Sequence, residues 1–322
     1  MRTFPLGEIL SVLDKDEVLH AVRASFISKE LGNTSSPQPM QILFHNEQGD
    51  LTGDCHVKAA QDSEIPYFVI KAATGFYHNK ALGLPVNNGF SLLMSAQTGQ
   101  PVALFQDEGM LTSLRTAAAG ALAASLAPNI HSEDILAVVG TGHQAELQIL
   151  WIAHLTGIKR IRVLGRNFDA ATQFAHKITS LGFDCIAVRS AKELAEKAKI
   201  IVTATPSTKA MLMSEDVPDG VHIVALGADS PGKQELDPKL LKRAEIIITD
   251  DHQQCIEHGE FGIAYRSNLI DDNADISLGA VLSGKVAPTI SGQGISIVDL
   301  TGLGGQDLAI AMVVWHRLNS QT

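Results

Sequence analysis

The sequence predicts an α/β protein in which a doubly wound parallel sheet is inserted into a second, discontinuous α+β domain. From about residue 133 to residue 249, short apolar runs alternate with segments whose apolar residues recur at helical spacing. This alternation is typical of a parallel sheet covered by helices on both faces. The flanking segments follow longer, mixed patterns, and the first strand-to-helix turn of the central segment is rich in glycine. These observations together predict the class.

The elements of the central segment follow from the apolar runs in chain order. Strands are expected at residues 134–140, 160–165, 183–189, 200–206, 222–228 and 245–250. Helices are expected at residues 144–155, 170–181, 190–198 and 238–244, with Ser190 as the N-cap of the third.

The flanks are expected to build the second domain. Residues 66–71 have the pattern of a strand, and residues 89–106 predict two strands joined by a turn at 97–100. An apolar helix is expected within residues 301–318, with Trp315 in the core or at a dimer interface. We therefore expect one discontinuous domain formed by residues 1–118 and 299–322, and an inserted domain formed by residues 119–298.

Composition excludes several classes of function. The net charge of -10 argues against a nucleic-acid or anionic-membrane partner. No run of about 18 apolar residues occurs, and the N-terminus lacks the apolar core of a secretory signal. Three scattered cysteines favour a reducing compartment. We expect a soluble cytoplasmic protein.

A phosphate-binding turn is the first candidate site. Gly140, Gly142 and Ala145 form a G-x-G-x-x-A pattern between a predicted strand and a predicted helix. The glycines permit a tight turn and close approach of a pyrophosphate, and the alanine lets the helix pack against the sheet. This pattern predicts a Rossmann-type dinucleotide site made of Gly140, Thr141, Gly142, His143, Gln144 and Ala145; the alternative is an accidental glycine turn.

The end of the second strand indicates the cofactor. Sites that prefer NAD usually carry an acid there, whereas this chain has Gly165, Arg166 and Asn167. Arg166 can pair with a 2′-phosphate, so NADP(H) is favoured and NAD(H) is the alternative cofactor. Arg166 as a solvated surface residue is the other interpretation.

Three charged residues are candidates for the chemistry. Asp229 follows the strand expected at 222–228, so it should overlook the crevice at the carboxyl end of the sheet. It could exchange a proton with a substrate nitrogen, or it could cap a helix or turn that begins at Ser230. Lys71 and Arg115 are cations suited to a substrate carboxylate, and for each the alternative is an ordinary salt bridge.

Five blocks resemble the ornithine cyclodeaminase/mu-crystallin family and occur in its order: KAATGFYHNKALGLP, LTSLRTAAAGALAASLA, VVGTGHQAELQ, ALGADSPGKQELD and VDLTGLGGQDLA. The GADSPGKQELD and TSLRTAAAG blocks are most similar to the archaeal type of alanine dehydrogenase. The resemblance implies that Lys71 is the active-site lysine, that Arg115 binds the substrate carboxylate and that Asp229 is the catalytic acid. It also implies a homodimer formed through the split domain.

The chain departs from the family pattern near residue 40. Gln41 stands where many members carry a cation, and the following segment introduces His56 and Lys58. Lys58 could supply the missing charge to the substrate, or Gln41 could mark a different substrate. A surface position is the simpler expectation for Lys58, because lysines are rarely buried without a partner. This departure argues against ornithine cyclisation.

Other clusters are expected to be structural. Asp299 and Asp307 recur in the C-terminal family block, and we assign both to structure. The acids and histidines of residues 250–260 follow no metal-ligand spacing, so caps explain them and no metal is predicted. Cys55 beside His56 lacks an orienting acid and is not expected to be a nucleophile.

The sequence predicts an NAD(P)H-dependent imino-acid (ketimine) reductase or L-amino acid dehydrogenase. Pyrroline-2-carboxylate is an example of the predicted imino-acid substrate. Ornithine cyclodeaminase is the first alternative. The second is a mu-crystallin-type protein that binds NADP and a small ligand.

Overall fold

The computed structural model describes residues 1–320 and, within that range, every side chain except those at positions 77 and 80. The chain divides into two compact units. The first contains Met1–Arg115 and the segment that starts at Leu303; the second contains Thr116–Gly302. The chain passes between the units at 115/116 and 302/303, close to the expected 118/119 and 298/299.

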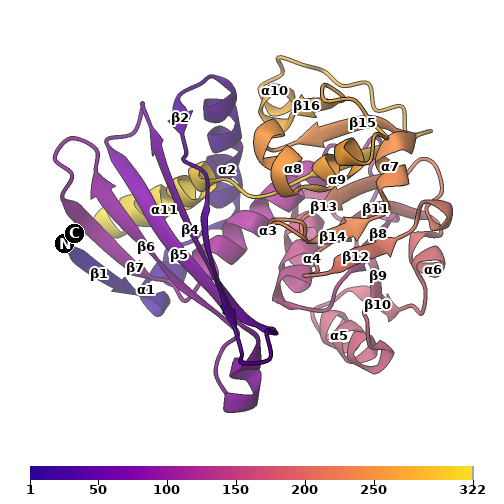
Figure 1. Ribbon diagram of the computed structural model, residues 1–322, viewed down its shortest axis with the longest axis horizontal. Helices are drawn as coiled ribbons and strands as arrows, with labels where there is room; N and C mark the ends of the chain where they lie inside the picture. Colours follow the sequence, from indigo (N-terminus) through magenta and orange to yellow (C-terminus); the bar gives the residue numbers. More distant parts are fainter. Residues whose placement is uncertain (321–322) are drawn as a thin grey trace. The chain divides into compact units, whose positions relative to one another are not determined.

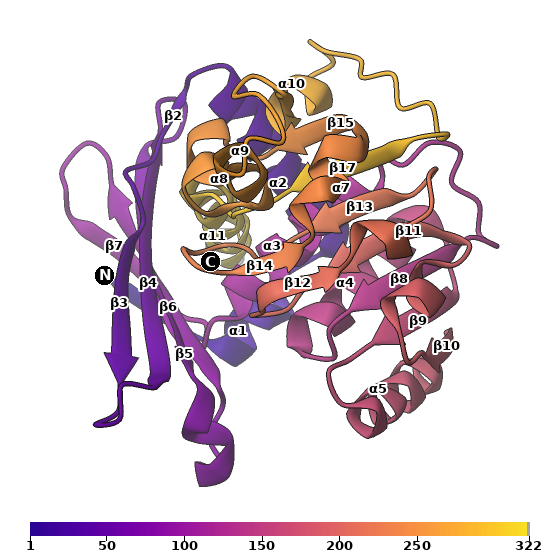
Figure 2. The same ribbon diagram turned by 45° about the vertical axis from the view of Figure 1, so that its right-hand side comes forward.

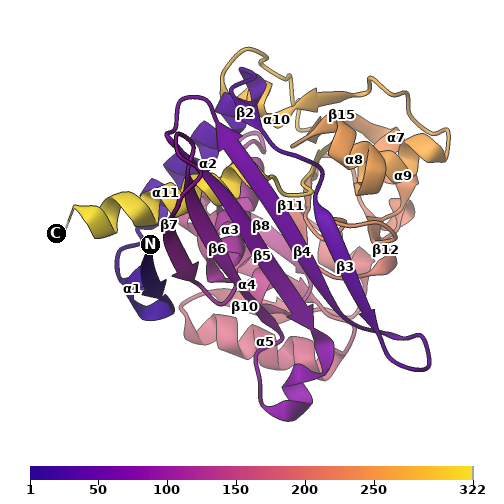
Figure 3. The ribbon, with the colours of Figure 1, turned by 60° about the vertical axis from the view of Figure 1, so that its left-hand side comes forward.

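The first unit is built on a mixed seven-stranded sheet, seen face-on in Figure 3. The strand order is β1-β7-β6-β5-β4-β2, and β3 also pairs with β4. Only the β1–β7 pair is parallel among these ladders. The strands are β1 (Arg2–Pro5), β2 (Thr34–Ser35), β3 (Met40–His45), β4 (Leu51–Asp62), β5 (Tyr67–Phe76), β6 (Asn87–Ser95) and β7 (Pro101–Gln106).

Helices of the first unit lie along one face of this sheet (Figure 1). They include α1 (Leu6–Ser11), α2 (Lys15–Glu30) and the C-terminal α11 (Gly304–Asn319). Because side chains alternate across a strand, every second residue faces these helices. Val69, Leu93 and Phe105 are completely buried, whereas their sequence neighbours are less buried. The predicted turn at 97–100 and the C-terminal helix are confirmed.

The second unit contains an eight-stranded sheet in which all strand pairs are parallel. Its order is β10-β9-β8-β11-β13-β17-β15-β16. The strands are β8 (Ile135–Val139), β9 (Arg160–Leu164), β10 (Asp184–Ala187), β11 (Ala198–Thr203), β13 (His222–Ala225), β15 (Ala244–Thr249), β16 (Asp275–Ser277) and β17 (Ile295–Asp299). A separate pair is formed by β12 (Thr208–Leu212) and β14 (Gln234–Leu236).

Both faces of this parallel sheet are covered. On one face, alternate strand residues form a core with apolar side chains of α6 (Ala191–Ala195), α7 (Pro238–Arg243) and α9 (Glu260–Arg266). On the other face, His222 Nε2 of β13 lies 3.0 Å from the carbonyl oxygen of Ala123 in α3 (Met110–Ala124). The predicted doubly wound α/β class is therefore confirmed.

The helices that cover this sheet connect successive strands (Figure 2). They are α3 (Met110–Ala124), α4 (His143–Thr156), α5 (Phe168–Ser180), α6 (Ala191–Ala195), α7 (Pro238–Arg243), α8 (His252–His258), α9 (Glu260–Arg266) and α10 (Leu278–Leu282). The predicted cap is confirmed, because Ser190 Oγ accepts a hydrogen bond from Glu193 N at 3.1 Å. In the described range of residues 1–320, no helix combines the length and the apolar character that crossing a bilayer requires.

Candidate functional site

The glycine-rich turn joins β8 to α4 where the strand order reverses between β8 and β11. Gly140 has a φ of 123°, and a Cβ there would lie 2.8 Å from the carbonyl oxygen of Ala204 after β11. A side chain at this position would therefore clash and strain the backbone. In open α/β sheets such a reversal marks the crevice that binds ligands.

The start of α4 has the features of an anion site. A Cβ on Gly142 would meet no heavy atom within 4 Å, so a ligand can approach the backbone there. Ala145 is fully buried and lets the helix pack against the sheet. Within the described part of the chain, Gln144 Nε2 is a buried donor without a protein partner. These residues and the helix N-terminus fit a dinucleotide pyrophosphate.

The loop after β9 presents Arg166 on the surface. Asn167, also expected to bind cofactor, caps α5 by accepting a hydrogen bond from Ala170 N at 3.0 Å. The Arg189 guanidinium lies 3.6 Å from the centre of the Phe168 ring, the first residue of α5. Arg166 and Arg189 therefore lie shortly after the ends of β9 and β10, where a 2′-phosphate could be recognised.

The loop after β13 carries Asp229. No helix begins at Ser230, since the next helix, α7, starts at Pro238 and is capped by Asp237. The helix-capping interpretation of Asp229 is therefore wrong, whereas a turn does begin at Ser230, whose carbonyl oxygen accepts a hydrogen bond from Lys233 N at 3.3 Å. Asp229 Oδ1 accepts a hydrogen bond from Lys233 Nζ at 2.6 Å, and 44% of the Asp229 side chain is exposed.

Glu235 secures the loop that bears Asp229. It is completely buried and accepts hydrogen bonds from Thr203 Oγ1 at 2.6 Å, Thr205 N at 2.6 Å, Thr205 Oγ1 at 2.7 Å and Gly227 N at 2.7 Å. These donors follow or end β11 and β13. One carboxyl group thus ties together two strand ends of the second unit.

Two further buried acids accompany Glu235, and we call Glu235, Glu260 and Asp299 the acid cluster. Glu260 Oε1 accepts from Glu235 N at 2.6 Å, and Asp299 Oδ2 accepts from Phe261 N at 2.9 Å. Burial raises the pKa of Glu235, raises that of Glu260 well above its ordinary value and raises that of Asp299 to about 7. The structural assignment of Asp299 agrees with its hydrogen bond to α9.

The acids of residues 250–260 act mainly as backbone acceptors. Asp251 caps α8 by accepting from Gln254 N at 2.6 Å. Asp250 accepts from Thr301 N at 2.9 Å and from Gly302 N at 2.7 Å. The interpretation of these acids as caps is confirmed for Asp251.

Cations gather in the first unit, and we call Lys58, Lys71 and Arg115 the cation cluster. Asp307 of α11 joins it: its Oδ1 lies 3.2 Å from Lys71 Nζ and 2.9 Å from Arg115 Nε. Arg115 Nη1 also donates to Gln306 Oε1 at 2.9 Å. Asp307 Oδ2 has no protein partner in the described residues. Two cations therefore share one carboxylate oxygen.

Sheet register brings Lys58 to Lys71. The two residues are direct partners in the antiparallel β4–β5 ladder, so their side chains emerge on the same face. Lys58 is only 8% exposed, which makes the expectation of a surface lysine wrong. Burial lowers the pKa of Lys71 to about 7; Asp307 opposes this shift, while Arg115 and Lys58 add to it.

Gln41 lies on the same face, further along the sheet. It pairs with His56 in the β3–β4 ladder, and Gln41 Nε2 lies 3.5 Å from His56 Nε2. His56 in turn lies 3.7 Å from Asp54 Oδ1. A substrate role for Gln41 stays a prediction.

Sequence reasoning missed Asp307 as a site residue, because it assigned this aspartate to structure. Although burial by itself raises the pKa of Asp307, Arg115 and Lys71 hold it below its ordinary value. Thr112 was also missed; its Oγ1 accepts a hydrogen bond from Lys71 Nζ at 3.0 Å. The GGQD block at the start of α11 was the available signal for Asp307.

With this geometry established, comparison with known proteins identifies the family. The chain matches the ornithine cyclodeaminase/mu-crystallin family over residues 7–322. The chain belongs to this family. The resemblance predicted from the five sequence blocks is thereby confirmed.

Relatives within the ornithine cyclodeaminase/mu-crystallin family carry several activities. The alanine dehydrogenase of Archaeoglobus fulgidus is 33% identical over 315 residues, covering 98% of this chain and 94% of the relative. The iminosuccinate reductase of Paracoccus denitrificans is 33% identical over 309 residues, covering 95% and 93%. An ornithine cyclodeaminase of Brucella suis is 32% identical over 281 residues, covering 86% and 74%.

Solved structures of family members share the fold. An archaeal alanine dehydrogenase dimer with bound NAD superposes with a TM-score of 0.87 at 30% identity, covering 100% of this chain and 97% of that one. The iminosuccinate reductase of Paracoccus denitrificans in complex with NAD+ gives a TM-score of 0.88 at 28% identity, with the same coverage. These relatives are dehydrogenases or reductases, which supports an enzymatic role for this chain.

Proposed function

We propose that this protein is an NAD(P)-dependent oxidoreductase that interconverts a small imino acid and the corresponding L-amino acid. Lys71 and Arg115 would hold the substrate carboxylate. The cofactor, when bound, accepts or supplies a hydride at the α-carbon. Holding the reacting groups together removes much of the entropic barrier to this transfer.

The observation that carries this proposal is the sharing of Asp307 Oδ1 by Lys71 Nζ and Arg115 Nε. Burying a cation costs free energy unless the cation is paired, and here two cations share one oxygen of a single counter-ion. A substrate carboxylate would give both cations a further partner through charge-assisted hydrogen bonds. The planar guanidinium of Arg115 matches the two oxygens of a carboxylate better than the point charge of a lysine ammonium would.

Asp229 is proposed as the acid–base group. Conversion of an amine to an imine releases a proton from nitrogen, and Asp229 would accept that proton; in reduction it would return it. Its carboxylate is accessible and accepts a hydrogen bond from the ammonium of Lys233. This accessibility distinguishes it from the buried acids of the same unit.

We propose NADP(H) as the preferred cofactor, although the two solved relatives described above were determined with NAD bound. The loop after β9 offers Arg166 and no acid at positions 165–167. Arg166→Ala should weaken NADPH binding by about tenfold and leave NADH almost unchanged, as expected for one lost charge-assisted contact. Equal losses for the two cofactors in titration calorimetry would refute the phosphate role.

Ornithine cyclodeaminase is the second candidate, because a relative with that activity is 32% identical. That reaction removes ammonia from L-ornithine and forms L-proline without net consumption of cofactor. The same carboxylate-binding cations and the same proton acceptor would serve it.

One assay separates the candidates. Purified protein is incubated with NADPH and pyrroline-2-carboxylate or another small imino acid, and separately with L-ornithine and NAD. Loss of NADPH absorbance supports the reductase. Ammonia and proline without net cofactor change support the cyclodeaminase. Tight cofactor binding without turnover of any tested substrate would favour a binding protein of the mu-crystallin type.

We also propose that two copies associate through the outer face of the first sheet. Alternate residues there are apolar and incompletely buried, and Met40, Ile42 and Phe90 are 54%, 45% and 44% exposed. An exposed apolar face of this kind marks an interaction surface. The double variant Ile42→Lys and Phe90→Lys should give a monomer by light scattering, whereas an unchanged dimer would exclude this face.

A further inference from the structure

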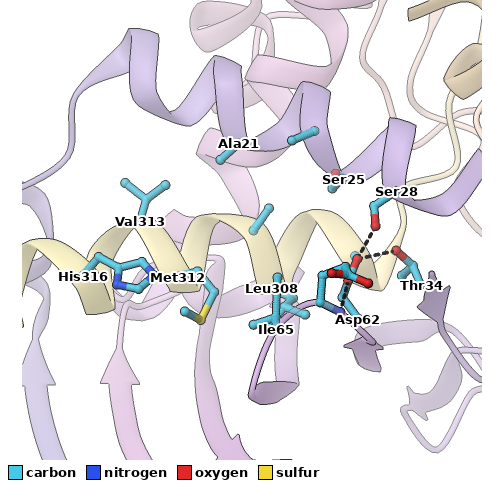
Figure 4. A pocket seen from close by; sticks show the side chains of 14 residues that line it. Ala21, Ser25, Ser28, Thr34, Asp62, Ile65, Leu308, Met312, Val313 and His316 are labelled. Atoms are coloured by element: carbon cyan, nitrogen blue, oxygen red, sulfur yellow. Dashed lines mark hydrogen bonds between the residues drawn. The ribbon is translucent and has the colours of Figure 1, made fainter. Parts of the chain in front are cut away.

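A cavity of about 330 Å³ lies between α2 and α11 in the first unit (Figure 4). This volume is at the lower end of the range for small-molecule sites, roughly 300–1,000 Å³. Its walls are mainly apolar and include Ala21 of α2, Leu308 and Met312 of α11, and Ile65. None of the residues assigned to substrate or cofactor above lines it.

One end of the cavity is polar. Asp62 is 5% exposed there, and its Oδ2 accepts hydrogen bonds from Ser28 Oγ and, at 3.0 Å, from Thr34 Oγ1. Asp62 Oδ1 accepts from Glu64 N at 3.0 Å. These three donors are neutral. The buried carboxylate is thus hydrogen-bonded, but none of these contacts neutralises its charge.

The hydroxyl groups at this end offer no free proton. Ser28 and Thr34 each donate to Asp62, and Ser25 Oγ donates to the Val22 carbonyl oxygen at 2.7 Å. A hydroxyl has one proton and two lone pairs, so each of these oxygens can still accept. The polar end therefore presents acceptors and negative charge to a ligand.

We propose that this cavity binds a small primary amine with an apolar body. The ammonium group would donate to Asp62 and to the hydroxyl oxygens beside it, and the apolar body would lie against Leu308 and Met312. An amino acid would bring its own carboxylate toward Asp62 and the lining residue Glu64, so the site should discriminate against the substrates of the proposed reaction. The inference goes beyond that reaction and does not depend on it.

The probes are hexylamine and its uncharged analogue 1-hexanol, titrated calorimetrically into the full-length protein. Hexylamine should bind saturably and at least about tenfold more tightly than 1-hexanol, because only the amine makes a charge-assisted hydrogen bond. Asp62→Asn, which is nearly isosteric, should abolish that difference. Asp50→Asn is the matched control, since Asp50 is exposed and does not line the cavity.

A second variant tests the location of the site. Ala309→Leu places a larger side chain on the cavity wall and should weaken both probes, while thermal unfolding checks that the protein still folds. The proposal is overturned if hexylamine shows no saturable binding. It is also overturned if both probes bind equally well, or if neither Asp62→Asn nor Ala309→Leu weakens hexylamine.

Discussion

The cation cluster of the first unit and the acid cluster of the second both bury ionisable side chains, but they satisfy them differently. Glu235 receives four hydrogen bonds from strand ends of its own unit, and burial raises its pKa. Lys71 and Arg115 instead share one oxygen of Asp307. The acid cluster is satisfied largely by the backbone that it supports, whereas in the cation cluster two cations depend on one oxygen of a single carboxylate.

Burial alone therefore does not identify a functional charge. Raised pKa values in the acid cluster accompany hydrogen bonds to the backbone of neighbouring loops and helices, which is a structural arrangement. In the cation cluster, like charges on adjacent strands oppose one another, and Asp307 is the one carboxylate among the described residues that contacts both Lys71 and Arg115. In such an arrangement the two cations are incompletely paired, and a bound carboxylate would complete their pairing.

The largest effect is expected from the acid cluster, and it should be on stability. Glu235→Ala leaves one buried donor, Thr203 Oγ1, and three partly buried donors without their acceptor, so the free energy of unfolding should fall by about 3 kcal/mol or more. Denaturant unfolding measures this loss. The exposed Glu133→Ala is the control and should change little; equal stability of the two variants would show that Glu235 does not support the loops.

The next effect is expected on turnover, from the acid that lies outside the acid cluster. Asp229→Asn should lower kcat by roughly 100-fold or more, the usual contribution of a positioned acid or base, while thermal stability and cofactor affinity stay close to those of the original protein. Asp219→Asn, which removes an exposed ion-paired carboxylate from the same unit, is the control. Full activity of Asp229→Asn would exclude the proton-transfer role.

A smaller effect should follow from changing the shape of one cation while keeping its charge. Arg115→Lys loses the guanidinium fork, so KM for the carboxylate substrate should rise by about 10-fold or more with little loss of stability. The surface pair of Arg317 with Glu17 provides the control variant Arg317→Lys. If KM stays constant in Arg115→Lys, the carboxylate binds elsewhere.

The smallest effect is a pH dependence of substrate binding. Because the pKa of Lys71 is about 7, this group loses its proton as pH rises through neutrality, and KM should increase by at most about tenfold per pH unit. The free energy of unfolding should rise over the same pH range in which the affinity for substrate falls. Between pH 7 and 10.5 the folded state binds fewer protons at Lys71 than the unfolded state, so this group's contribution to stability increases with pH.

Lys71→Arg tests the assignment of that pH dependence, since arginine stays charged over the whole range. The variant should show a KM that is nearly constant from pH 7 to pH 9. A rise of the same size in the variant would assign the titration to a different group.

The local elements of the second unit could be predicted because their apolar periodicity is strong. The six expected strands and four expected helices all occur, and Ser190 caps the helix at which it was placed. The strand β17 (Ile295–Asp299) was not predicted, although its residues are fully buried between β13 and β15. Its short apolar run carries no periodicity of its own, so only its neighbours in the sheet reveal it.

The doubly wound sheet, the glycine turn at Gly140 and the candidate residues Lys71, Arg115 and Asp229 could be predicted, because local patterns and family motifs lie in consecutive residues. The contacts that these residues make depend on the tertiary structure. Arg115 and Asp307 are 192 positions apart, and only the folded chain brings their side chains into hydrogen-bond contact. Lys58 reaches Lys71 through strand register, which depends on contacts between segments and so cannot be read from either segment alone.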